Sequence, residues 1–140
     1  MREAVVGGCL CGSVRFACNG PLGAAAYCHC ADCRKCTGSA FNVSVGVERS
    51  DFEITAGSPK GFTKTGDSGN ELTRHFCPDC GSPLFTSSPG HPDRVYVKAG
   101  AFDDPALIQP AYQSWTRSSA PWATIEPGLQ SYETTARIPG

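Results

Sequence analysis

The sequence predicts a mostly β fold, and three observations lead to that class. Short stretches alternate between apolar and polar residues, as half-buried strands do. Glycine and proline, with 16 and 11 residues in the chain, separate these stretches. No stretch carries an apolar repeat of helical period for longer than about three turns. We expect the 140 residues to form a single domain over positions 1–140.

Residues 41–47 show the clearest alternation. Every second position is apolar, so this stretch predicts a strand whose buried face is formed by Phe41, Val43, Val45 and Val47.

The other predicted strands are shorter. The alternation at residues 13–18 predicts a strand that buries Cys18 as a small core residue, which is a common position for a free cysteine. A loop at residues 66–70 joins two stretches in a hairpin pattern. Beyond residue 102 we expect little regular structure apart from a turn at 103–105. Further strands are expected over residues 24–27, 52–55, 61–64, 71–76, 83–86 and 94–99.

Nine cysteines set this chain apart from an ordinary β protein. Their number is odd and seven of them fall in close groups, whereas a secreted disulfide scaffold usually has an even number without such groups. We therefore expect metal ligation rather than disulfides, and a reducing, cytoplasmic compartment.

Charge and hydropathy exclude several classes of partner. The formal net charge is −1 and there is no basic run, so nucleic acid is not an expected partner. No stretch approaches the roughly 20 apolar residues of a membrane helix. The first residues lack the apolar core of a secretory signal, so we expect neither a membrane span nor secretion.

The densest group places Cys28, Cys30 and Cys33 within six residues. Thiols at this density select Zn²⁺ or an iron–sulfur cluster over a hard cation. In an extended segment the first two point to one side, and a helical turn then brings Cys33 to the same ion. The group supplies three ligands and leaves a fourth position open. An alternative is that Cys36, three residues further on, closes the site as a structural one.

The other grouped cysteines come from two distant segments. Cys9 and Cys11 lie in a glycine-flanked Cys-x-Cys, and Cys77 and Cys80 form a Cys-x-x-Cys with the Pro and Gly of a zinc knuckle. Each pair is half a site. Together they complete a closed set of four thiolates, the usual arrangement for structural zinc.

Motifs around the cysteines carry a further signal. They are residues 8–12, residues 28–35 with Gly38 and Phe41 behind them, and residues 68–70, 74–82 and 120–122. In order and spacing they resemble the glutathione-dependent formaldehyde-activating enzyme family, which includes centromere protein V. The match spans nearly the whole chain.

This resemblance implies a twisted β-sandwich of the β-tent type that carries two zinc ions. It also implies carbon–sulfur bond chemistry, the joining of formaldehyde and glutathione. Carried over by position, the structural zinc ligands are Cys9, Cys11, Cys77 and Cys80, and the active-site zinc ligands are Cys28, Cys30 and Cys33.

The leading hypothesis is a zinc-dependent carbon–sulfur lyase. The open site would activate a small glutathione-like thiol for reversible addition to an aldehyde such as formaldehyde, with Cys28, Cys30 and Cys33 as catalytic ligands. Two alternatives are a non-catalytic, zinc-stapled binding module and a thiol or redox sensor that uses Cys36.

Other side chains near the motifs have two interpretations each. Arg34 and Lys35 either bind the carboxylates of a peptide-like thiol or form a solvated face. His29 lies between ligands that point the other way, so we expect it to face outward, and His75 to pack or hydrogen-bond beside the knuckle rather than ligate. Four aromatic residues either wall a pocket or form core: Phe41, Phe85, Trp115 and Trp122.

Overall fold

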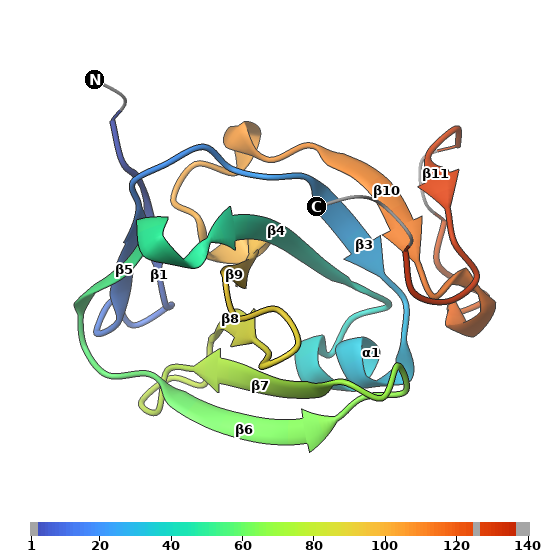
Figure 1. Cartoon of the computed structure of the whole chain (residues 1–140), viewed down its shortest axis with the longest axis horizontal. Coiled ribbons are helices and arrows are strands. Elements are labelled where there is room, and N and C mark those ends of the chain that lie inside the picture. The colour runs from blue at the N-terminus through green and yellow to red at the C-terminus, as the bar shows by residue number, and fades with distance from the viewer. Residues whose placement is uncertain (1–2, 125–126, 137–140) are drawn as a thin grey trace.

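The computed structural model, described for residues 3–124 and 127–136, contains two β-sheets and one short α-helix (Figure 1). The mostly β class predicted from the sequence is confirmed. The smaller sheet has the order β1-β2-β5, with β1 at Val5–Gly8, β2 at Arg15–Cys18 and β5 at Phe52–Ala56.

The larger sheet has eight strands in the order β11-β10-β3-β4-β9-β8-β7-β6. It bends strongly, so that β6 and β7 lie across from β3 and β10, with β4, β8 and β9 between them (Figure 1). Its strands are β3 (Ala25–Cys28), β4 (Asn42–Glu48), β6 (Lys60–Thr65), β7 (Glu71–Phe76), β8 (Pro83–Ser87), β9 (Arg94–Lys98), β10 (Pro110–Ser114) and β11 (Gln130–Ser131).

A single hydrophobic cluster joins the two sheets. Phe16 and Phe52 of the smaller sheet pack ring against ring, and Phe52 contacts Phe85 of β8 with ring centroids 4.7 Å apart. Val14, Phe16 and Cys18 are each only 1% exposed, as the alternation at residues 13–18 predicts. Burying such side chains is the main favourable contribution to folding.

Strand β4 is buried on both faces, which the alternating pattern did not predict. Val45 and Val47 lie in the core, as expected. On the opposite face, Asn42 is only 8% exposed and Ser44 is half-buried, because both line a cavity rather than the protein surface. The polar residues of the alternation therefore line a cavity.

The helix α1 (Ala31–Thr37) follows β3 directly. Cys30 is its N-cap, and the Sγ atom accepts a hydrogen bond from the backbone N–H of Cys33. Gly38 ends the helix in the left-handed conformation, with φ of 69°, as expected for a glycine cap. Asp32 in the first turn accepts a hydrogen bond of 2.6 Å from Lys64, which ties the β6–β7 hairpin to the helix.

The strands predicted from the sequence are all present, with shifts of one or two residues at their ends. Strands β1, β10 and β11 were not predicted. Strand β10 pairs in parallel with β3 and β11, so its pairing joins segments that are distant in the chain. Four 3₁₀ turns complete the described elements, at Arg49–Asp51, Ala99–Ala101, Pro105–Leu107 and Thr116–Ser118.

Within the described residues, no helix combines the length and the apolar character that crossing a membrane requires.

Candidate metal centres

The nine cysteines all lie in the described residues, and none forms a disulfide. Two sets of thiols converge, and in each set the sulfur atoms lie within 4.8 Å of one another. The two sets are Cys9, Cys11, Cys77 and Cys80, called the four-thiol cluster below, and Cys28, Cys30 and Cys33, called the three-thiol cluster.

The four-thiol cluster is built from two tight turns. Gly12, in the first turn, and Gly81, in the second, both have positive φ values near 80°, a conformation that glycine adopts without strain. The turns are fastened to each other by a hydrogen bond of 3.0 Å from the backbone N–H of Leu10 to Ser82 Oγ. Backbone geometry therefore brings the two distant cysteine pairs together.

The geometry of this cluster suits a tetrahedral metal. The Cys11 sulfur lies 3.6 Å from that of Cys9 and 3.8 Å from that of Cys77. Four sulfurs held about 2.3 Å from one tetrahedral Zn²⁺ are about 3.8 Å apart. Hydrogen bonds from Ser82 lower the pKa of Cys80 to about 5, and the backbone N–H of Val14 lowers that of Cys9 to about 7. Cys9 and Cys80 therefore favour the thiolate form that binds metal, whereas the pKa of Cys11 in the same cluster is raised.

The three-thiol cluster lies where β3 passes into α1. Cys28 ends β3, Cys30 caps the helix, and Cys33 lies in its first turn and is 8% exposed. The helical turn predicted after Cys30 is therefore present. Among the residues that the structure describes, no fourth His, Cys, Asp or Glu joins these three sulfurs.

Contacts among the three thiols show why they suit a cation. Hydrogen bonds with Cys30 and Cys33 lower the pKa of Cys28, whereas those with Cys28 and Cys30 raise the pKa of Cys33. The charge of one thiolate therefore opposes ionisation of its neighbours. A soft divalent ion removes this conflict, because it neutralises the thiolates together, so the residues fit Zn²⁺.

Cys36 does not join the three-thiol cluster, although it follows Cys33 by one helical turn. The alternative of a closed site completed by Cys36 therefore has no support from the arrangement of the sulfurs.

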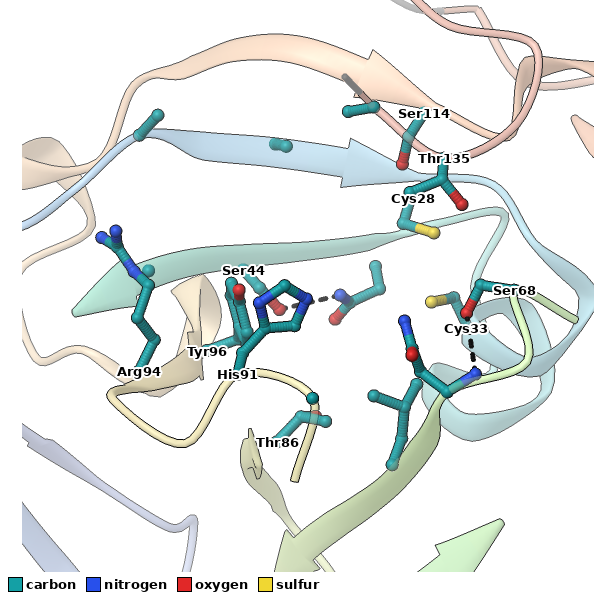
Figure 2. Close-up of a pocket in the computed structure, with 18 of the residues that line it drawn as sticks. Cys28, Cys33, Ser44, Ser68, Thr86, His91, Arg94, Tyr96, Ser114 and Thr135 are labelled. Atoms are coloured by element: carbon teal, nitrogen blue, oxygen red, sulfur yellow. Dashed lines mark hydrogen bonds between the residues drawn. The ribbon is translucent and has the colours of Figure 1, made fainter. Parts of the chain in front are cut away.

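The three-thiol cluster opens onto a cavity of about 1180 Å³. Cys28 and Cys33 lie at one end with Ser68 and Ser114 nearby, and Arg94 lies at the other end (Figure 2). Its charged walls are mainly cationic, because four cationic side chains outnumber two carboxylates. These side chains are Arg49, Arg74, Arg94 and Lys98 against Glu48 and Asp93.

A buried lysine on the cavity wall was missed by the sequence analysis. Lys98 is only 8% exposed, and its Nζ donates a hydrogen bond of 2.6 Å to Asn42 Oδ1. Burial lowers its pKa, whereas nearby cysteine thiolates oppose that shift. The sequence places this lysine near the end of the predicted strand 94–99, but no local pattern indicates which groups its side chain faces.

The prediction that His29 faces outward is wrong. Its side chain is 1% exposed, and its ring lies against Phe41. Gln113 donates a hydrogen bond to Ser131 through Nε2, which leaves its Oε1 to accept one of 2.9 Å from His29 Nε2. The period-two argument failed because β3 ends at Cys28, so His29 lies in the turn before the helix.

The other predicted residues divide between core and surface. His75 stacks on Phe85 and hydrogen-bonds to Ser87 Oγ at 2.9 Å, as expected for packing rather than ligation. Of the four aromatic residues, Phe85 is core and Trp115 lines the cavity. Phe41 is half-buried against Tyr27 and does not line this cavity, and Trp122 is 73% exposed and does neither.

On α1, Lys35 is exposed and neighbouring Arg34 is half-buried, and neither lines the cavity. Their use in binding the carboxylates of a thiol substrate therefore gains no support.

A mostly β chain with one closed and one open thiol cluster defines a class of thiol-rich, metal-binding β proteins. Within that class, the sequence profile of the glutathione-dependent formaldehyde-activating enzyme matches residues 4–118. The match covers well over half of the chain, and the chain belongs to this family.

The fold is shared with a Rhodobacter sphaeroides protein of known crystal structure. The two superpose with a TM-score of 0.56 at 17% sequence identity, over 91% of this chain and 98% of that one. At this identity the likeness concerns the fold alone. A search of curated protein sequences finds no match.

Proposed function

We propose that this protein is a carbon–sulfur lyase that catalyses the reversible addition of a small thiol to an aldehyde. The thiol is glutathione-like and the aldehyde is formaldehyde or a close relative, as the family description suggests. We further propose that the chain holds two Zn²⁺ ions in a reducing, cytoplasmic setting. The four-thiol cluster would hold the structural ion, and the three-thiol cluster would hold the ion at the reaction site.

One observation carries this proposal: the three-thiol cluster lacks a fourth ligand from the described chain and lines a cavity. A bound Zn²⁺ would lower the pKa of a thiol that completes its coordination, which provides a nucleophile at neutral pH. Cys28 and Cys33 both line the cavity, so a thiol substrate reaches the open side of the cluster from there.

The chain itself positions the reactants. Ser114, which pairs with Cys28 across β10 and β3, hydrogen-bonds to that sulfur and orients it, and its hydroxyl points into the cavity (Figure 2). Placing sulfur and carbonyl carbon together contributes to the rate through proximity alone. The cavity also has room for the remainder of a peptide-like thiol.

The proposal is tested by measuring zinc content together with the exchange between formaldehyde and its glutathione adduct, followed by NMR. We expect two zinc ions per chain and an exchange rate above the uncatalysed one. Cys28→Ser should lose one zinc ion and the rate enhancement while the fold is retained.

The matched control is Cys18→Ala, which removes a core cysteine outside both clusters. It should retain both metal ions and the rate enhancement. If the protein holds two zinc ions but no thiol changes the exchange rate or the NMR spectrum, the proposed function is contradicted.

A further inference from the structure

Lys98 is a buried cation for which the fold provides no carboxylate. Within the described part of the chain, neither Lys98 nor Arg74, which lines the same cavity, takes part in an ion pair. The positive charge of Arg74 further disfavours the ammonium form of Lys98. A buried charge that lacks a carboxylate partner costs stability. Nearby cysteine thiolates favour the ammonium form, and an anionic ligand in the cavity would favour it further.

Two polar neighbours fix where this cation lies. Asn42 Nδ2 donates a hydrogen bond of 2.8 Å to Ser44 Oγ, so the amide turns its Oδ1 toward Lys98. Asn42 is also the residue of β4 that pairs with Cys28 of β3. Both Asn42 and Lys98 are only 8% exposed and line the cavity. The lysine head is thereby held beside the end of the cavity where the three-thiol cluster lies.

The proposed reaction generates an anion at that end. The deprotonated sulfur supplies the electron pair of the new C–S bond, and the π pair of the carbonyl moves onto its oxygen. That alkoxide then takes a proton from water, while the thiol has released its own proton to solvent. Nothing is oxidised or reduced.

The three-thiol cluster is poorly suited to stabilising that alkoxide. Three thiolates and one divalent ion sum to a net charge of −1, which weakens the attraction for a second anion. The activation barrier of an addition that forms an oxyanion is usually lowered by a hydrogen-bond donor that points at the developing negative charge. With a separate cation in the cavity, the metal ion would hold the sulfur and the cation would stabilise the oxygen.

We propose that Lys98 binds the carbonyl oxygen of the aldehyde and stabilises the alkoxide formed when sulfur adds, with Asn42 as its positioning residue. This inference rests on the proposed function. It assigns Lys98 as a catalytic residue and Arg74, which lines the same cavity, as a second source of positive potential.

The first test measures binding without catalysis. Co²⁺ replaces zinc, and the sulfur-to-cobalt absorption is titrated with mercaptoacetate and with ethanethiol, which are similar in size but differ in one anionic group. The wild type should prefer mercaptoacetate. Lys98→Met should reduce that preference by about tenfold or more, because a charged hydrogen-bond donor is removed. Lys60→Met, at an exposed lysine of β6, should leave it unchanged.

The second test measures the rate of adduct exchange. Lys98→Met should lower kcat by about 10²- to 10³-fold, the usual effect of removing one oxyanion donor, with unchanged metal content and ethanethiol affinity. Lys98→Gln, which keeps a neutral donor, should lose less. It also replaces the methionine variant if that variant fails to fold.

The outcomes separate the two proposals. If ethanethiol and mercaptoacetate both leave the cobalt spectrum of the wild type unchanged, the thiol site is wrong and the role of Lys98 falls with it. If both thiols bind but Lys98→Met keeps the full preference and the full kcat, only the role of Lys98 is overturned.

Discussion

The two thiol clusters use the same side chain but are enclosed differently. In the four-thiol cluster, Cys77 is completely buried, and hydrogen bonds between the two turns hold the sulfurs at the spacing of a tetrahedron. The three-thiol cluster comes from one continuous segment, and two of its sulfurs, Cys28 and Cys33, line a cavity. One cluster joins distant parts of the chain, whereas the other presents sulfur to a space for ligands.

This contrast shows that the number of thiols that converge at one place follows from topology rather than from cysteine content. Two turns that face each other supply two ligands each and leave no open position. A single strand-to-helix segment supplies three ligands on one side, and the sheet beyond it is lined with polar residues rather than with a fourth ligand. Structural zinc sites are closed and catalytic ones keep an open position.

The largest expected effect on folding is at the four-thiol cluster. Cys77→Ser removes a buried ligand, so one metal ion should be lost and the free energy of unfolding should fall by at least about 3 kcal/mol, since structural zinc contributes directly to folding. Metal analysis and thermal unfolding measure both. If Cys77→Ser keeps two metal ions and an unchanged unfolding temperature, the four-thiol cluster is not the structural metal site.

A smaller effect is expected from the cavity lysine. Burial lowers the pKa of Lys98 in the folded state, so between that lowered value and 10.5 the unfolded chain binds more protons than the folded one. Stability should therefore rise with pH across that window, and the cost of burying the charge is fully present below it. At neutral pH the Lys98→Met variant should be more stable than the wild type by roughly 1 kcal/mol. Its stability should no longer rise with pH across this window.

Urea unfolding at several pH values, compared with Lys60→Met, measures this difference. Equal pH dependence in the wild type and in Lys98→Met would show that the lysine is not penalised by burial. Greater stability with lower activity is the pattern expected of a residue retained for function.

The smallest effect is expected at Cys36. Because its sulfur is outside the three-thiol cluster, Cys36→Ser should leave metal content and metal affinity unchanged. Competition with a chromophoric chelator measures the affinity. Loss or loosening of one ion would make Cys36 a ligand and would make the open cluster a closed one.

Much of the fold and the grouping of the cysteines was accessible from sequence, because alternation and short cysteine spacings are local patterns. Alternation identified β4 and the β6–β7 hairpin, and the spacing of Cys28, Cys30 and Cys33 required the turn that α1 provides. His29 was misplaced because the same alternation was applied beyond the end of β3. Strand β10 was missed because its pairing with β3 joins segments far apart in the chain.

By itself, the sequence determined which side chains can hold metal, since thiol chemistry and short spacings are local properties. Only the tertiary structure decided what lies around each cluster. Lys98 reaches Asn42 across 56 positions of sequence, through the pairing of β4 with β9, and no local pattern specifies that contact. The environment of a site, including its charge, its enclosure and its access, is produced by strands that meet only when the sheet has formed.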